Sequence, residues 1–386
     1  MITPAFTPAD AFGGPVTAIM NQVKSLHKQG FSVKVYSTSV VDPQRPHLSS
    51  RLPSREDVGN VTIKRYRPIF CILGYWVTPT IMKDLLTDEF DIIHAHSARS
   101  FQLDIAALVS WIRHRKLIVS PHGSLYSYGL ASGQGKRLLF AAHNAILKLV
   151  FRRACKIIAT SSDEENQFKR FGIDTEKIVC IPNFLDETQY AKLPPAGAFR
   201  TELGIGMHEK VILFLGRINE IKGLDVLLFA YSRIANNASD AWLVIVGPDG
   251  GYLSTIKKML KGIVGSSHIV LAGPRFGVSK IQALVDSDFV VVPSNYESFG
   301  ITAIEAFLSG KPVIASRVGN LPNLVRHNET GLLFDKGNVN QLAERLEWAL
   351  ENPKKLELMG DRARQLVLNL YSAQAVENAL ALLLSE

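Results

Sequence analysis

Short runs of β-branched residues alternate with helical patterns along nearly all of this 386-residue chain. Such alternation is typical of parallel sheets covered by helices. We therefore predict an α/β fold with two doubly wound, Rossmann-like domains facing a central cleft. The expected strands are residues 32–38, 61–66, 91–95, 117–120, 156–160 and 177–181 in the first half, and 211–215, 242–246, 268–272, 289–292, 312–315 and 331–334 in the second.

The alternation pauses near residue 185 and resumes after Pro194-Pro195. We predict an N-terminal domain over residues 1–190, a C-terminal domain over 191–370, and a final helix over 371–386 that packs back on the N-terminal domain. Residues 1–6 resemble the end of a first strand, which is usually central in such a sheet. Either this strand is very short or the chain begins late.

The net charge of +8 belongs to the first half of the chain. Residues 1–195 have 24 lysines and arginines against 16 acids, whereas residues 196–386 have 19 of each. A basic half suits a phosphorylated substrate, nucleic acid or an anionic membrane surface, or it is an ordinary solvated surface. We expect no nucleic acid, because no helix-turn-helix, zinc-finger or RNA-binding pattern accompanies the charge.

No run of 18 apolar residues without charges and no secretory leader is visible, so we expect no transmembrane helix and a cytoplasmic protein. Cys71, Cys155 and Cys180 lie far apart without metal spacing, which indicates free thiols in a reducing compartment. Residues 136–153 form a helix with basic ends. This helix lies on a membrane surface or packs in the ordinary way on the sheet.

Residues 290–310 read as an apolar strand, a polar loop that contains Glu297, and a helix that starts at Gly300 and contains Glu305. A helix that opens at a glycine presents unpaired N–H groups and suits a phosphate. Eight helical positions separate two carboxylates by about 12 Å along the axis. This spacing does not suit a hydrolytic carboxylate pair. It favours a grip on two parts of one phosphorylated ligand, such as a sugar nucleotide.

Gly216, Arg217 and Lys222 follow the first strand of the second domain. Two cations there suit a diphosphate and would stabilise charge on a leaving phosphate, or they are simply solvated. His122 follows the strand at 117–120. It is placed to bind a sugar hydroxyl or to shuttle a proton, unless it is a structural histidine.

Three further patterns are weaker. Gly13-Gly14-Pro15 precedes a helix, where glycine permits close approach of a ligand or makes an ordinary turn. His94 and His96 point to one face of their strand, but no third ligand accompanies them, so structural contacts are favoured over a metal. Residues 162–165 are expected to form a capping box that opens a helix.

These motifs together resemble family 4 of the retaining glycosyltransferases, which have the GT-B fold. The resemblance rests on the E-x7-E spacing from Glu297 to Glu305. It also rests on Gly13-Gly14-Pro15, Pro121-His122-Gly123, Ile181-Pro182-Asn183, Gly216-Arg217, Lys222-Gly223 and the stretch 328–334, all in the order of the family. It implies an acceptor-side N-terminal domain, a C-terminal domain that binds a nucleotide-sugar donor, and a glycan or polyprenyl-linked acceptor.

The resemblance also implies roles for single residues. Arg217 and Lys222 would hold the diphosphate with Gly216, Gly300 and Ile301 close to it. Glu305 would bind the ribose hydroxyls, Glu297 and His122 would contact the transferred sugar, and Gly14 would approach the phosphates or the acceptor. No metal and no cofactor would be required, the hexosyltransferase-like reaction would retain anomeric configuration, and the protein would lie peripherally on the inner face of the membrane. The alternatives are a nucleotide-sugar epimerase of the same fold and a non-catalytic carbohydrate-binding protein.

Overall fold

The computed structural model describes residues 1–43, 52–59, 61–72, 74–127, 134–183, 185–371 and 373–385. The chain forms two compact units: unit 1 comprises Met1–Phe184 with Gln374–Glu386, and unit 2 comprises Leu185–Ala373. The division thus falls before residue 185, earlier than the boundary expected at residue 190. The reason is that Leu185 and Tyr190 are buried in a hydrophobic core of unit 2.

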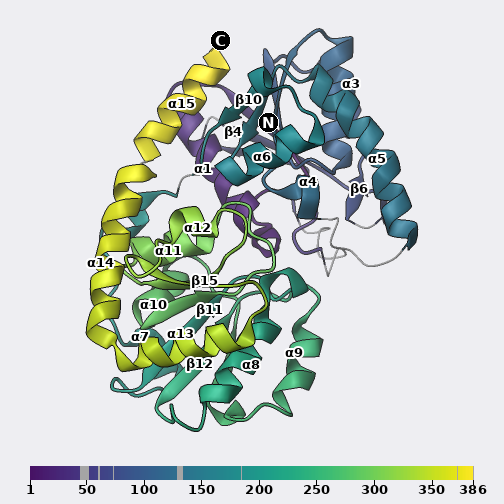
Figure 1. Cartoon of the computed structure of the whole chain (residues 1–386). Helices are drawn as coiled ribbons and strands as arrows, with labels where there is room; N and C mark the ends of the chain where they lie inside the picture. The colour runs from purple at the N-terminus through teal and green to yellow at the C-terminus, as the bar shows by residue number, and fades with distance from the viewer. Residues whose placement is uncertain are drawn as a thin grey trace. The chain divides into compact units, whose positions relative to one another are not determined.

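Unit 1 is built on a twisted sheet (Figure 1) whose described strands number eight, in the order β10-β9-β8-β7-β1-β2-β4-β3. Among these described strands, β3 is the one that runs antiparallel to its neighbour. The short β1 lies between β2 and β7, so the predicted first strand is both short and central. The strands are β1 (Ile2–Thr3), β2 (Val33–Thr38), β3 (Arg55–Val58), β4 (Val61–Tyr66), β7 (Ile92–His96), β8 (Lys116–Ser120), β9 (Lys156–Ala159) and β10 (Ile178–Cys180), and β5 (Phe70–Ile72) pairs with β6 (Tyr75–Val77) in a separate hairpin.

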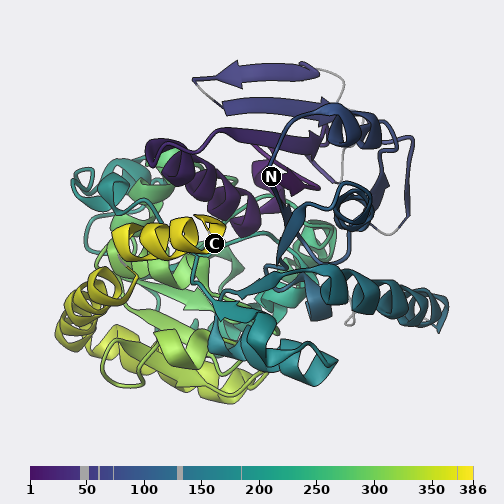
Figure 2. The ribbon, with the colours of Figure 1, turned by 90° about the horizontal axis from the view of Figure 1, so that it is seen from above.

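Helices cover both faces of this sheet because its strands are apolar on both sides. The helices of unit 1 are α1 (Gly14–Lys28), α2 (Ile81–Thr87), α3 (Phe101–Ile112), α4 (Ser124–Ser127), α5 (Gln134–Arg153), α6 (Ser162–Phe171) and α15 (Ala373–Ser385). Figure 2 shows α15 beside α1, and the Gln29 side chain just after α1 donates to the Glu377 carbonyl over 3.3 Å. The last helix of the chain therefore completes the helical layer of unit 1.

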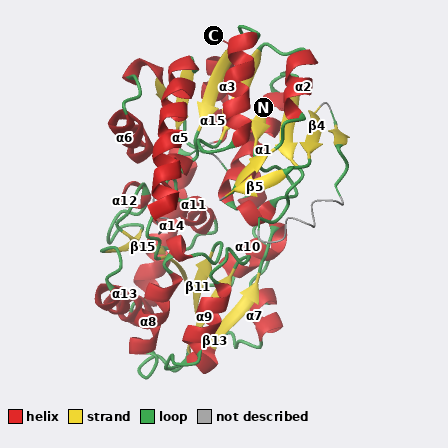
Figure 3. Cartoon of the chain, turned by 90° about the vertical axis from the view of Figure 1, so that its right-hand side faces the viewer, coloured by secondary structure: helices red, strands yellow, loops and turns green. Residues whose placement is uncertain are grey.

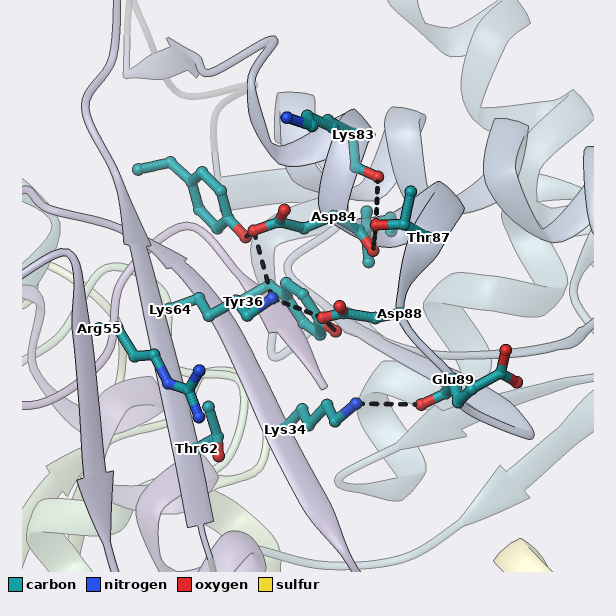
Figure 4. Close-up of polar contacts among 12 residues, drawn as sticks. Lys34, Tyr36, Arg55, Thr62, Lys64, Lys83, Asp84, Thr87, Asp88 and Glu89 are labelled. Carbon is teal, nitrogen blue, oxygen red and sulfur yellow. Dashed lines mark hydrogen bonds and ion pairs between the residues drawn. The ribbon is translucent and has the colours of Figure 1, made fainter.

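A half-buried polar network attaches α2 to the sheet (Figure 4). The Lys64 ammonium group lies 2.7 Å from Asp88 and 3.3 Å from Asp84. The hydroxyl groups of Tyr36 and Tyr66 donate to Asp88 and Asp84, each over 2.6 Å. Burial, together with the neighbouring carboxylates, raises the pKa of both tyrosines. The cation and the two carboxylates satisfy one another, so this cluster is a structural contact.

Unit 2 contains a parallel sheet whose described strands have the order β13-β12-β11-β14-β15-β16. Figure 3 shows these strands between helices. Its strands are β11 (Lys210–Leu215), β12 (Ala241–Val246), β13 (Ile269–Gly273), β14 (Phe289–Val292), β15 (Val313–Ser316) and β16 (Gly331–Phe334). Along β11, Val211 and Leu213 enter one core, and Ile212 and Phe214 enter the core on the opposite face. A strand buried on both faces must be apolar at every position, which is why these runs stand out in the sequence.

The helices of unit 2 are α7 (Ala198–Leu203), α8 (Leu224–Ile234), α9 (Leu253–Leu260), α10 (Gly277–Val285), α11 (Ile301–Leu308), α12 (Leu321–Leu324), α13 (Val339–Glu351) and α14 (Pro353–Leu370). Gly360 of α14 touches the turn after α11: a Cβ atom there would lie 2.1 Å from the Gly310 carbonyl oxygen. Glycine at this position therefore lets α14 pack closely on unit 2.

Residues 353–385 are the part of the described chain that is long and apolar enough, by length and composition, to be considered for a membrane span. This run consists of two helices. Met359 and Val367 of α14 are buried in unit 2, whereas Val376 and Leu380 of α15 are buried in unit 1. Core packing accounts for these four apolar residues, and 24% of the apolar window is buried.

Candidate functional site

The loops that follow β11, β12, β14 and β15 meet at the carboxyl edge of the unit 2 sheet. The Asn295 N–H donates to the Ile221 carbonyl over 2.7 Å, and the Asn320 N–H donates to the Glu297 carbonyl over 3.1 Å. In parallel α/β sheets this edge is where ligands bind. The segments that carry Arg217, Lys222, Glu297 and Gly300 are therefore gathered at one edge, although they are far apart in the sequence.

Two glycines allow these loops to approach so closely. Gly223 has a φ of 63°, and a Cβ atom there would lie 2.0 Å from the Pro293 carbonyl oxygen. Gly319 has a φ of 50°, and its Cβ atom would lie 1.8 Å from the Glu297 carbonyl oxygen. Both positions have a left-handed backbone and touch another loop, so each one requires glycine.

Lys222 and Glu297 form an ion pair between the first and third of these loops. The Lys222 Nζ atom lies 2.6 Å from Glu297 Oε2, and the two side chains are only 24% and 13% exposed. The Ser294 hydroxyl also approaches Glu297 Oε2, at 3.5 Å. The lysine expected to hold the diphosphate and the glutamate expected to contact the sugar are thus direct neighbours.

Glu305 has a different set of partners. It is 5% exposed on α11 and forms an ion pair with Lys280 of α10. Burial and the adjacent Glu305 carboxylate raise the pKa of the Tyr190 hydroxyl. Glu297 and Glu305 therefore each have a lysine partner of their own.

The start of α11 has the geometry of an anion site. Gly300 caps the helix with a φ of 98°, and its carbonyl accepts the N–H of Ile304 over 3.1 Å. The N–H groups of Ile301 and Thr302 precede this first helical hydrogen bond, so the helix itself offers them no acceptor. Together with the positive end of the helix dipole, they suit a phosphate oxygen.

Gly216 and Arg217 follow β11 at the same edge. The Gly216 N–H donates to the Val246 carbonyl over 2.9 Å, which joins the ends of β11 and β12. The Arg217 side chain packs against the loop after β12, because a Cβ atom on Gly250 would lie 2.7 Å from Arg217 Cγ. Of the residues expected on the donor side, Gly216, Arg217, Lys222, Gly300 and Ile301 are at or beside this edge of unit 2, whereas Gly14 belongs to unit 1.

His122 lies at the corresponding edge of unit 1, in a tight turn after β8 where its φ is 51°. Its Nε2 atom is 2.9 Å from His96 Nδ1, and His94 Nε2 is 2.8 Å from the Ser120 hydroxyl. Burial lowers the pKa of His94 to about 3 and of His122 to about 4, and it lowers the pKa of His96 well below its usual value of 6.5. These three histidines are therefore neutral at physiological pH.

A buried carboxylate supports the His122 turn. The Glu164 carboxylate accepts the Gly123 N–H over 2.6 Å, and it accepts the Thr160 N–H over 2.8 Å. The helix cap expected at residue 162 is one residue earlier, since the Ser161 hydroxyl accepts the Glu164 N–H. Burial raises the pKa of Glu164 in spite of these donors. Glu164 links α6 to the turn that carries His122.

Gly14 is the first residue of α1, after Gly13 with its φ of 80°. A Cβ atom on Gly13 would meet nothing within 4 Å, so close packing is not what requires glycine there.

Among the described residues, no group of three or more His, Cys, Asp or Glu side chains is arranged to hold a metal ion. Cys71, Cys155 and Cys180 are unpaired thiols.

Sequence reasoning missed His96 as the neighbour of His122, Lys280 as the neighbour of Glu305, and Glu164 as the support of the His122 turn. No local signal marks Lys280, because its partner is 25 positions away on another helix. His96 carried a signal, since it ends a strand beside the strand that leads to His122.

Known family models match both halves of the chain. Residues 12–189 match the family described as Glycosyltransferase Family 4, and residues 197–366 match Glycosyl transferases group 1. Together the two matches span most of the chain, which therefore belongs to the family 4 glycosyltransferases.

Individual relatives are distant. The chain is 25% identical to N-acetyl-alpha-D-glucosaminyl L-malate synthase of Bacillus anthracis over 75% of this chain and 73% of that protein. It is 30% identical to D-inositol 3-phosphate glycosyltransferase of Rhodococcus opacus over 71% of this chain, and it spans only 62% of that protein's length.

The fold is GT-B, as several solved structures show. Anabaena HepE, solved with UDP-glucose, superposes with a TM-score of 0.79 and 21% identity, covering 100% of this chain and 99% of HepE. Sucrose-phosphate synthase of Thermosynechococcus elongatus has a TM-score of 0.79 and 22% identity, covering 100% and 98% of the two chains.

Proposed function

We propose that this glycosyltransferase moves a sugar, with retention of configuration and without a metal, from a nucleotide-sugar donor to a glycan or polyprenyl-linked acceptor. The observation that carries the proposal is the carboxyl edge of unit 2. This edge combines the start of α11 with two carboxylate–lysine ion pairs, Lys222–Glu297 and Lys280–Glu305. None of the relatives described above is an epimerase, and intact pairs of this kind do not favour a non-catalytic protein.

The donor would be bound along this edge in three parts. The N–H groups of Ile301 and Thr302, with Lys222 and Arg217, would bind the diphosphate. Glu305, oriented by Lys280, would accept hydrogen bonds from the ribose hydroxyls. Glu297, oriented by Lys222, would accept hydrogen bonds from hydroxyls of the transferred sugar. The solved complex of HepE with UDP-glucose makes a uridine donor the first candidate to test.

The reaction breaks the bond between the anomeric carbon and the phosphate oxygen and forms a bond to the acceptor oxygen on the same face. The leaving diphosphate takes the acceptor proton, so no protein base is needed. Lys222 stabilises the negative charge that grows on this phosphate. Neutral His122 contributes hydrogen bonds to the sugar and no positive charge, because its pKa is about 4.

A screen of UDP-, GDP- and ADP-sugars by thermal shift tests donor binding. A true donor at 100-fold its Kd raises stability by about 2.7 kcal/mol. Stability unchanged by every donor would contradict the proposal. Product analysis of a turning-over donor then separates transfer to an acceptor from release of an isomerised donor.

Lys222→Ala is expected to lower donor turnover by about 10²-fold or more, the scale for loss of one contact to a developing oxyanion. Lys257→Ala, an exposed lysine of α9 in the same unit, is the matched control and should keep wild-type turnover. Equal rates for the two variants would reject the role assigned to Lys222.

We further propose that the protein is cytoplasmic and associates peripherally with an anionic membrane surface on its inner face. The supporting observations are the basic first half of the chain and a lipid-linked acceptor, which would be reached at such a surface.

A further inference from the structure

One face of unit 1 has more exposed apolar side chains than its core requires. We call it the α3–α5 face, defined by Leu108, Trp111 and Ile112 of α3 and by Ile146 and Leu149 of α5. Trp111 is 65% exposed and Leu149 is 63% exposed. The same helices bury other residues in the core, so packing inside unit 1 does not account for these five.

The two helices pack together and are neighbours in Figure 1, so we infer that the five residues form one surface. The guanidinium group of Arg153, at the end of α5, donates to the carbonyl groups of Ser110 and Arg115 over 2.8 and 3.1 Å. Spacings of three and four residues place the exposed side chains on one side of each helix.

The sequence that forms most of this face is basic, although fully exposed Asp91 lies 3.9 Å from Arg115 near the end of α3. The stretch from residue 105 to residue 162 contains nine lysines and arginines and no aspartate or glutamate. Lys148 and Arg152 are exposed next to Leu149 on α5, and Lys116 is exposed just beyond α3. Asp104, the acidic residue of α3, is bound to Tyr75 and His143, and its side chain is only 16% exposed.

We propose that the α3–α5 face docks on an anionic lipid surface. Trp, Leu and Ile side chains enter the interface between headgroups and acyl chains, while lysines and arginines bind the headgroups. A nucleic acid would satisfy the cations but leave aliphatic Leu108, Ile112, Ile146 and Leu149 without a partner. The inference deepens the proposed membrane association and rests on it, since it names the residues that would make the contact.

The position of the face suits this task. Ile112 and Arg153 each lie shortly before a strand begins, at Lys116 and Lys156 respectively, so this end of the two helices is at the start of the strands. The His122 turn lies at the opposite end of β8. Docking would therefore leave the carboxyl edge of the unit 1 sheet uncovered.

Flotation of the full chain with vesicles tests the proposal. Vesicles of phosphatidylcholine alone should bind little protein, whereas vesicles that also contain phosphatidylglycerol should bind it, and high salt should weaken this binding. Lys148→Ser with Arg152→Ser should lower the partition coefficient about 25-fold, or about fivefold for each charge. Trp111→Ser with Leu149→Ser should also lose vesicle binding.

Matched controls lie in unit 2. Lys257→Ser with Lys258→Ser removes two exposed lysines, and Phe229→Ser removes a side chain that is 49% exposed. These variants should float like the wild type, and every variant should retain the wild-type melting temperature and donor-induced thermal shift. A wild type that floats but binds no donor would reject the proposed reaction and leave the docking face standing.

Three outcomes would overturn the docking proposal. The first is no flotation, or equal flotation with neutral vesicles. The second is a dimer, measured by sedimentation, that Trp111→Ser dissociates in a protein without vesicle affinity, because the face would then bind a second copy. The third is salt-sensitive binding to DNA without binding to vesicles.

Discussion

At the scale of single residues, the structure explains the site through pairs of side chains. Lys222 with Glu297 and Lys280 with Glu305 place a cation beside each acid of the E-x7-E motif. A lysine bound to a carboxylate holds it in one orientation, which a group that accepts hydrogen bonds from hydroxyls needs. His122 is oriented in the same way by His96, through the two ring nitrogens 2.9 Å apart.

The buried histidines predict a pH dependence of stability. The pKa of His94 is about 3 in the folded protein, against about 6.5 in the unfolded chain. The unfolded state therefore binds more protons as the pH falls below 6.5, and the folded state loses stability. Between pH 7 and pH 5 this loss is about 2 kcal/mol for one such histidine.

Urea unfolding at pH 7 and pH 5 measures this effect. His94→Gln should reduce the difference between the two pH values by about 2 kcal/mol, whereas the exposed control His208→Gln should leave it unchanged. The same difference in His94→Gln as in the wild type would show that His94 does not carry the effect.

At the scale of elements, the site depends on loops that touch each other through backbone atoms. Gly319→Ala would place a methyl group 1.8 Å from the Glu297 carbonyl oxygen. We expect this variant to shift the Glu297 loop, to lower stability by about 1–3 kcal/mol and to weaken donor binding.

Gly337→Ala is the matched control, because Gly337 also has a left-handed backbone, with a φ of 72°, but its Cβ atom would meet nothing within 4 Å. Both variants suffer the same type of backbone strain, and only Gly319→Ala adds a collision. Calorimetry and donor titration of the two variants measure the difference. Equal losses in both would mean that backbone strain alone matters.

At the scale of the whole molecule, the chain crosses from unit 1 to unit 2 and returns. Helix α14 packs in unit 2, and α15 packs in unit 1 beside α1. Unit 1 is therefore completed only when the last residues of the chain are in place, and its stability depends on a segment far from the rest of it in sequence.

Two leucines of α15 test this dependence. Leu380 is 1% exposed, so Leu380→Ala should lower the stability of unit 1 by about 2–5 kcal/mol. Leu382 is 66% exposed, and Leu382→Ala should change stability by about 0.5 kcal/mol or less. Thermal unfolding measures both. A donor-induced shift that persists in Leu380→Ala would place the damage in unit 1, and equal stabilities of the two variants would contradict the packing of α15.

Much of the fold is predictable because buried parallel strands must be apolar on both faces. Every strand expected from the sequence has a counterpart within about a residue or two of its predicted limits. The strands that sequence reasoning missed are β3, β5 and β6. The described residues of β3 and β5 are largely exposed and β6 has only three residues, so they lack the continuous apolar run that marks the others.

The sequence by itself determined the α/β architecture and the family, and it predicts the edge of each sheet where ligands would bind. Local periodicity and ordered motifs are enough for these. Only the tertiary structure decided which side chains are neighbours: Lys222 with Glu297, Lys280 with Glu305 and His96 with His122. It also showed that exposed residues of α3 and α5 share one face. Such contacts join segments that are distant in the chain, and their geometry follows from how the layers pack.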